Sequence, residues 1–193
     1  MILRFTLILS LVFVSASSFA GDLQAAFAAL QNSKVNYEPD GAVCEQLAIL
    51  KARVTYPESA YDITGGIEYD IGGETLGELD LVILEKQTRK VVLVEEVKCW
   101  KNYGSGLDKA KVQRDRFMWN LTKFTSKIRF TSYTDEQFTA ENFQNAFPFI
   151  FVSHAGGVKH GFDQELDFNM SEVRELRTQL LKCQAFGPCP KPE

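Results

Sequence analysis

The chain has 193 residues, enough for one domain or at most two small ones. Apolar residues make up 45% and charged residues 24%, which excludes disorder throughout, collagen and a small disulfide-only protein. The formal net charge of −4 is an average that hides a basic centre. Residues 86–129 carry twelve Lys and Arg against four Asp and Glu, a net charge of +8, whereas residues 21–85 carry −9 and residues 130–193 carry −4. Such a basic segment is typical of a polyanion-binding surface, although a solvated helix face has the same composition.

The first twenty residues have the pattern of a secretory signal peptide. Arg4 supplies a short positive region, residues 5–14 are almost wholly apolar, and Ser18-x-Ala20 fits the rule of small residues at the cleavage site. An uncleaved membrane anchor is the alternative, but the apolar run is short for a span. We therefore expect cleavage after Ala20 and a mature single domain, residues 21–193, that is periplasmic or extracellular and free of the membrane.

Four cysteines remain in the mature chain, and an even number in an oxidising compartment predicts two disulfides. Four cysteines allow three pairings, and the sequence does not choose among them. Cys183 and Cys189 could close a small loop, which would leave Cys44 with Cys99. A four-cysteine zinc site is the rival interpretation, but no pair has the C-x-x-C spacing typical of one.

The first half of the chain predicts two helices and then three strands. An Ala-rich helix covers residues 23–30, and a second helix covers residues 42–53, with Asp40 as its cap. Three strands then follow, at 65–71, 79–84 and 90–100, with a turn at 86–89 between the last two. Residues 81–84 and 91–94 are apolar at every position, which is typical of central strands covered on both faces.

The second half begins with a predicted chain break at Gly104-Ser105-Gly106. A helix over residues 107–124 follows, then strands over 127–133 and 147–153, and a last helix that Ser171 caps. The order predicts a mixed α/β domain whose sheet has helices on both faces. We expect its core over about residues 42–153, with a C-terminal helix and a cysteine-containing tail over residues 171–193.

Three charged side chains on the predicted strands form the candidate catalytic group. Glu96 and Lys98 are two residues apart in one strand and so project from the same face, on the side of Val92 and Val94. Asp80 lies on the neighbouring strand, about 4.8 Å away if the register allows. Two carboxylates in an apolar setting repel each other unless a cation joins them, and carboxylate oxygens suit Mg²⁺. A lysine beside such a metal can hold the attacking water and the phosphate, so the set fits phosphodiester hydrolysis.

Gly77-Glu78-Leu79-Asp80 followed by Glu96-Val97-Lys98 resembles the signature of the PD-(D/E)xK nuclease superfamily. This superfamily includes restriction-endonuclease-like proteins and Holliday-junction resolvases. The resemblance covers about residues 42–133 and implies an αβββαβ core. The chain has Leu79 where the named motif has proline, a common departure. Secretion argues against a role in recombination and favours degradation of foreign or extracellular DNA.

The resemblance also implies roles for single residues. Asp80, Glu96 and the backbone carbonyl of Val97 would bind the catalytic Mg²⁺, for which Mn²⁺ would substitute, and Lys98 would position and activate the water. Glu45 matches a helix glutamate that assists at the metal in many members, and Gln113 matches a glutamine of the following helix. The products would carry a 5′-phosphate and a 3′-hydroxyl.

Basic residues around the predicted helix 107–124 are candidates for sequence-independent contacts with phosphates: Lys101, Lys109, Lys111, Arg114 and Arg116. Trp100, Tyr103 and Trp119 are candidates for stacking on bases, or else core residues. The sequence thus predicts a secreted Mg²⁺-dependent endodeoxyribonuclease that acts on DNA, with RNA left open. The alternative is a catalytically silent binding module on the same fold.

Each of these features also has a plainer interpretation. A Glu-x-Lys tripeptide occurs by chance about once in a few hundred residues and is usually an exposed charge pair. Glu95 adjoins Glu96 on the opposite face, so a register slip of one residue would exchange the two. The sequence does not predict the oligomeric state.

Overall fold

The structure, a computed structural model, describes residues 22–132 and 138–192, so the predicted signal peptide lies outside the described residues. The described chain forms a six-stranded mixed sheet with four α-helices, which confirms the predicted mixed α/β class. The elements are α1 (Leu23–Leu30), α2 (Ala42–Thr55), β1 (Tyr61–Ile71), β2 (Glu74–Glu85), β3 (Lys90–Val97), α3 (Tyr103–Lys123), β4 (Ile128–Ser132), β5 (Phe149–Ser153), β6 (Gln164–Glu165) and α4 (Met170–Phe186). Two short 3-10 helices cover Ala140–Phe143 and Val158–His160.

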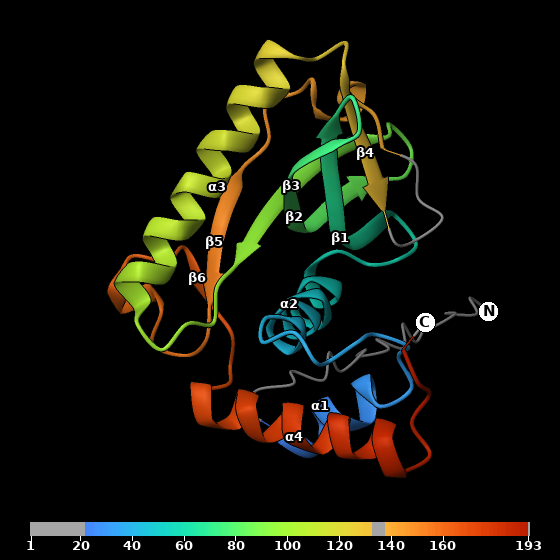
Figure 1. Cartoon of the computed structure of the whole chain (residues 1–193), viewed down its shortest axis with the longest axis vertical. Helices are drawn as coiled ribbons and strands as arrows, with labels where there is room; N and C mark the ends of the chain where they lie inside the picture. The colour runs from blue at the N-terminus through green and yellow to red at the C-terminus, as the bar shows by residue number, and fades with distance from the viewer. Residues whose placement is uncertain (1–21, 133–137, 193) are drawn as a thin grey trace, which may run out of the picture.

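The sheet has the strand order β4-β1-β2-β3-β5-β6 (Figure 1). Strands β1, β2 and β3 form an antiparallel meander, and β4 adds to its outer edge, antiparallel to β1. The chain then returns to pair β5 in parallel with β3, and β6 in parallel with β5. Strand β3 therefore lies between an antiparallel and a parallel neighbour, in the middle of the sheet.

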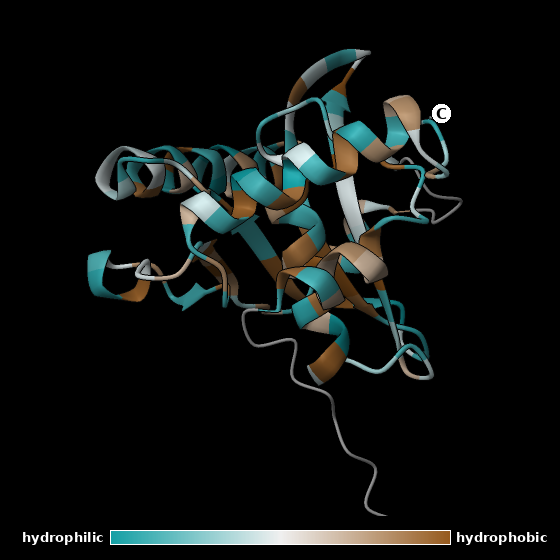
Figure 2. Ribbon diagram, turned by 90° about the horizontal axis from the view of Figure 1, so that it is seen from below, coloured by the Kyte–Doolittle hydropathy of each residue, from teal (hydrophilic) through white to brown (hydrophobic). Residues whose placement is uncertain are grey.

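Each face of the sheet is covered by helix. Leu81 and Ile83 of β2 pack in an apolar cluster with α1, α2 and α4, whereas the alternate residues Val82 and Leu84 pack with Phe117 of α3. In Figure 1, α1, α2 and α4 gather on one side of the sheet and α3 runs along the other. The helices in front of the sheet alternate between polar and apolar residues (Figure 2). These two apolar layers hold β2 and β3 from both sides.

The predicted helix caps at Asp40 and Ser171 are wrong. Gly41 is the residue before α2, and no side chain caps that helix, because the Asp40 carboxylate instead forms an ion pair with Arg177. Asn169 caps α4: its side-chain oxygen accepts hydrogen bonds from the Ser171 and Glu172 amides, and the Asn169 amide donates a hydrogen bond to the Glu172 carboxylate. This is a capping box, in which two side chains satisfy amides that the helix leaves free.

The predicted break at Gly104-Ser105-Gly106 is the first turn of α3. Asn102 begins that helix, since its side-chain oxygen accepts the Ser105 amide at 2.9 Å. Strand β3 ends at Val97 rather than at Trp100. An extra residue in β3, opposite the step from Ile83 to Leu84, turns Val92 toward the α2 side, so Val92 does not share the Val94 face as predicted.

Both disulfides that the cysteine spacing suggested are present, Cys44–Cys99 and Cys183–Cys189. They are consistent with an exported protein, because disulfides persist in oxidising compartments. Among the helices of the described chain, none combines the length and the apolar character that a membrane span requires.

Candidate active site

The candidate site lies where β2 and β3 separate. The hydrogen-bonded pairing of these strands runs from Glu85 opposite Lys90 to Leu81 opposite Glu95 and then stops. Asp80 is the first residue beyond it, and its carboxylate Oδ2 accepts the Val97 amide at 2.8 Å, in place of a strand carbonyl. The carboxylate therefore lies in the opening between the two strands, with only 6% of Asp80 exposed.

The alternation of β2 is interrupted at the same point. Leu79 packs in the apolar layer on the α3 side, while Leu81, two residues later, packs in the opposite layer. On β1, Gly66 has the positive φ of 65°, between the paired positions Gly65 and Ile67. Glycine adopts this conformation readily. The irregular backbone at Gly66 lies opposite the point in β2 where Leu79 and Leu81, on either side of Asp80, pack on opposite faces of the sheet.

Lys98 is the centre of the group. Its Nζ donates a hydrogen bond to Asp80 Oδ2 at 2.8 Å, lies 2.5 Å from Glu96 Oε1, and donates to the Val97 carbonyl at 3.3 Å. Strand β5 holds the backbone on both sides, because the Lys98 amide donates to the Val152 carbonyl and Ser153 Oγ donates to the Lys98 carbonyl. The structure thus brings together the three side chains that the sequence singled out.

Burial makes this group electrostatically costly. Glu96 is fully buried, and the contact with Lys98 is a close ion pair without the geometry of a hydrogen bond, so neither Glu96 oxygen has a hydrogen-bond partner within the described residues. Burial and then the Asp80 charge raise the pKa of Glu96 to about 8, while Lys98 opposes the rise. Burial alone would lower the pKa of Lys98, but Asp80 and Glu96 outweigh it and raise that pKa. Lys98 therefore remains an ammonium ion at neutral pH.

Glu45 reaches the group from α2 without a direct bond to it. Burial raises the pKa of Glu45 to about 7, and the charges of Asp80 and Glu78 add to the rise while Lys98 opposes it. The Glu45 carboxylate folds back toward Gly41, where an added Cβ would lie 2.7 Å from Glu45 Oε1. Glu45 thus interacts electrostatically with Asp80 and Lys98.

Sequence reasoning missed Glu78 as a neighbour of the site. Burial and the charges of Asp80 and Glu68 raise the pKa of Glu78, and Lys98 lowers it. Glu78 also lies opposite Glu68 in the β1–β2 pairing. The Gly72-Gly73 turn, which fixes that pairing, was the signal in the sequence that could have placed the two glutamates side by side.

Helix α3 covers the site from the other side. A Cβ added at Gly106 would lie 3.6 Å from the Lys98 Cβ, so the helix backbone passes close to the lysine stem. Farther along, burial raises the pKa of Tyr69 while a hydrogen bond from Arg116 lowers it, and Glu96 raises it again. Arg116 is thus linked to the site through the Tyr69 hydroxyl. Gln113 has a buried Oε1 without a hydrogen-bond partner in the described chain and no bond to Asp80, Glu96 or Lys98.

The proposed phosphate-binding residues do not share one face. Lys109 lies seven residues before Arg116 and so on the same side of α3. Lys111 points away from that side, and Arg114 covers the Phe151 ring at 5.1 Å and pairs with its neighbour Asp115. Lys101 precedes the helix and lines a separate cavity beside α4.

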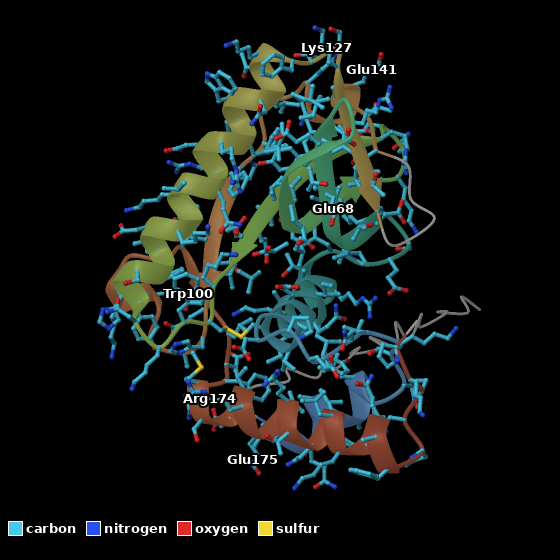
Figure 3. The ribbon with its side chains drawn as sticks, in the orientation of Figure 1. Glu68, Trp100, Lys127, Glu141, Arg174 and Glu175 are labelled. Atoms are coloured by element: carbon cyan, nitrogen blue, oxygen red, sulfur yellow. A yellow bond between two sulfur atoms is a disulfide. The ribbon has the colours of Figure 1, made fainter. Side chains whose placement is uncertain are left out.

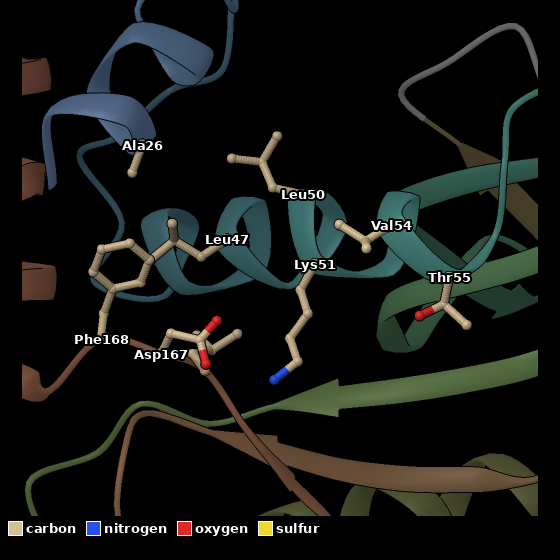
Figure 4. A pocket seen from close by; sticks show the side chains of 9 residues that line it. Ala26, Leu47, Leu50, Lys51, Val54, Thr55, Asp167 and Phe168 are labelled. Atoms are coloured by element: carbon tan, nitrogen blue, oxygen red, sulfur yellow. The ribbon is translucent and has the colours of Figure 1, made fainter. Parts of the chain in front are cut away.

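Glu95 belongs to the opposite layer, as its position in β3 predicts. It is 5% exposed, burial raises its pKa to about 7, and Lys51 opposes the rise. Lys51 also lines an apolar pocket of about 200 Å³ between α2 and the segment before α4 (Figure 4). The lining of this pocket includes none of Glu45, Asp80, Glu96 and Lys98.

The oxygens expected to bind a metal already surround a cation. Asp80 Oδ2, Glu96 Oε1 and the Val97 carbonyl all approach the ammonium of Lys98. The described residues contain no group of three or more His, Cys, Asp or Glu side chains arranged to hold a metal ion. The donor set and the two unpartnered oxygens of Glu96 suit a hard cation, provided that Lys98 withdraws from between the carboxylates.

No family model, curated protein or solved structure matches the chain in the three comparisons.

Proposed function

We propose that the protein is a secreted, metal-dependent nuclease that hydrolyses phosphodiester bonds of DNA. The single observation that carries the proposal is the convergence of Asp80, Glu96 and the Val97 carbonyl on one buried point at the opening between β2 and β3, with Lys98 at that point. The order α2, β1, β2, β3, α3, β4 supports a restriction-endonuclease-like αβββαβ core.

Asp80, Glu96 and the Val97 carbonyl would hold Mg²⁺, with Glu45 as a nearby further carboxylate. When bound, the metal lowers the pKa of a coordinated water and stabilises charge on the transferring phosphate. Lys98 would then turn its ammonium toward the attacking water and a phosphate oxygen. Arg116 would hold a neighbouring phosphate, while the Val152 carbonyl and Ser153 hydroxyl keep the Lys98 backbone fixed.

Plasmid cleavage by the oxidised mature protein tests this function. We expect nicking and linearisation with Mg²⁺ or Mn²⁺ and none with EDTA. Asp80→Asn, Glu96→Gln and Lys98→Ala should each lower the rate by at least about 100-fold, the order seen when a key electrostatic group is removed. Circular dichroism checks that the variants fold, and an RNA substrate in parallel tests the choice of nucleic acid.

Glu95→Gln is the matched control. Its carboxylate is also buried in β3, one residue from Glu96, but it faces the α2 layer. We expect this variant to cut at the wild-type rate. Activity that survives in Asp80→Asn and Lys98→Ala would place the chemistry elsewhere. If the wild-type protein binds DNA and does not cut it with any divalent metal, the chain is a silent binding module.

A further inference from the structure

A polar cavity, separate from the apolar pocket at Lys51, lies beside the candidate site, between the start of α4 and residues 99–102. Its volume is about 690 Å³. Its lining contains three cationic side chains and one indole, Lys101, Arg174, Arg177 and Trp100. Met170 and Val173 form its apolar part. The mixture of cations with an exposed aromatic ring is typical of sites that hold single-stranded nucleic acid.

The Cys44–Cys99 disulfide joins this cavity to the candidate site. Cys99 lines the cavity and adjoins Lys98, and its partner Cys44 adjoins Glu45. The Cβ atoms of Lys98 and Trp100 are also close together, since a Cβ added at Gly106 would lie 3.6 Å from the Lys98 Cβ and 3.4 Å from the Trp100 Cβ. A nucleic-acid strand bound at Lys98 would therefore pass Trp100 on its way to the cavity.

The backbone at Trp100 is held in place, and its ring is open to solvent. The residue is 45% exposed, yet the Trp100 carbonyl lies 3.2 Å from His154 Nε2 and the Lys98 carbonyl accepts Ser153 Oγ. An exposed indole on a fixed backbone can stack on a base without ordering the main chain that carries it. Figure 3 shows Trp100 and Arg174 on the same side of the molecule, where α3 and α4 begin.

The charges in the cavity favour an anion. Arg177 is fixed, because it donates to the carbonyls of Tyr37 and Glu38, and Asp40 at 3.3 Å offsets its charge. Arg174 and Lys101 form no ion pair within the described residues, so two cationic charges remain uncompensated. Arginine suits phosphate because its planar group donates two hydrogen bonds at once.

We propose that this cavity is a nucleotide subsite, in which Arg174 and Lys101 hold a phosphate and Trp100 stacks on the flanking base of the strand that passes the catalytic group. The inference rests on the proposed function, since it assumes a nucleic-acid substrate at Lys98. It adds a binding site on α4, a helix outside the region that resembles the nuclease superfamily.

Binding of a labelled DNA single strand of about 12 nucleotides in EDTA tests the subsite without any cleavage. We expect Trp100→Ala to weaken binding about tenfold and Arg174→Ala about fivefold. Arg174→Ala should also reduce the dependence of log K on log salt by about 0.7, the value for one phosphate contact on a single strand. Lys182→Ala is the control, because Lys182 is an exposed cation on the same helix outside the cavity.

Trp100 also supplies a direct signal. The chain has two tryptophans, so Trp119→Phe leaves Trp100 alone. We expect the bound strand to quench its fluorescence. Equal affinity in the wild type, Trp100→Ala and Arg174→Ala, or no binding by the wild type, would overturn the subsite. Equal competition by dextran sulfate would show a general polyanion surface and overturn it as well. Plasmid cleavage is measured separately, so its absence together with Trp100-dependent binding would refute only the nuclease.

Discussion

At the scale of single residues, Asp80 combines a structural and a chemical task. One of its oxygens accepts both the Val97 amide and the Lys98 ammonium, each at 2.8 Å. A carboxylate thus ends the β2–β3 ladder where a carbonyl would otherwise pair, and it orients the lysine in the same contact. The site depends on this opening in the sheet, because a continued ladder would bring backbone atoms into the place of the carboxylate.

Glu95 gives a prediction for stability against pH. Its pKa is about 7 in the folded protein against an ordinary value of 4.5, so the folded state binds more protons than the unfolded state between these values. Stability from this group is therefore fully present below pH 4.5 and is lost as pH rises from there through 7. At pH 8 we expect the free energy of unfolding of Glu95→Gln, measured by denaturant unfolding, to exceed that of the wild type by about 2 kcal/mol. At pH 5 the difference should be much smaller.

Glu74→Gln provides the comparison for this measurement, since Glu74 is an exposed glutamate at the start of β2. Its substitution should change the free energy of unfolding by less than about 0.5 kcal/mol at both pH values. A gain from Glu95→Gln that is equal at pH 5 and pH 8 would mean that improved packing, rather than the buried charge, is responsible.

At the scale of elements, the Cys44–Cys99 disulfide fastens α2 to the end of β3. Its two cysteines precede Glu45 and follow Lys98, so the cross-link fixes the distance between the helix and the strand that carry the site. It also closes a chain segment of 55 residues, against 6 for Cys183–Cys189. The longer loop loses more unfolded-state entropy when it is closed.

Removal of each disulfide in turn separates these effects. Replacing Cys44 and Cys99 with alanine should lower the free energy of unfolding by about 4 kcal/mol, and replacing Cys183 and Cys189 by about 2 kcal/mol. If the protein is the nuclease proposed above, only the loss of Cys44–Cys99 should reduce cleavage under conditions where both variants are fully folded. Denaturant unfolding and plasmid cleavage measure the two quantities. Equal activity in both variants would show that the cross-link has no part in arranging the site.

The elements also show what the sequence could and could not predict. The alternation and apolar runs of β2 and β3 were sufficient to place Glu96 and Lys98 on one face, since a central strand has few other ways to bury its residues. The predicted start of α3 is wrong because glycine is typical of a chain break, whereas Asn102 caps a helix that includes Gly104 and Gly106. The close approach of Gly106 to Lys98 and Trp100 is a tertiary contact and leaves no trace in local sequence.

The distant members of the site were harder to predict for the same reason. Glu78 is influenced by Glu68 on β1 and by Lys98, and Tyr69 by Arg116 on α3 and Glu96 on β3, so both depend on how separate elements come together. The cavity that Trp100 and Arg174 share joins residues more than 70 positions apart in the chain. Only the assembled sheet and α4 bring such groups together.

At the scale of the whole molecule, charge is divided along the chain. The net charge of −4 includes a central segment of +8, and that segment contains β3 and α3, which border the candidate site. The fold also distributes the basic side chains over different sides of α3. Lys109 and Arg116 share one side of this helix, while Lys111 projects from another. A polyanion should therefore dock on one side of the helix, despite an acidic protein overall.

Lys109→Ala and Lys111→Ala test this arrangement, because both remove one exposed lysine from the same helix. If duplex DNA lies along the side that bears Lys109 and Arg116, Lys109→Ala should weaken binding in EDTA and reduce the dependence of log K on log salt by about 0.9, the value for one phosphate contact on a duplex. Lys111→Ala should leave both quantities unchanged. Fluorescence anisotropy across a series of salt concentrations measures them. Equal losses in the two variants would mean that the whole basic segment attracts DNA without a fixed orientation, and a loss confined to Lys111→Ala would place the duplex on the opposite side of α3, away from Lys98.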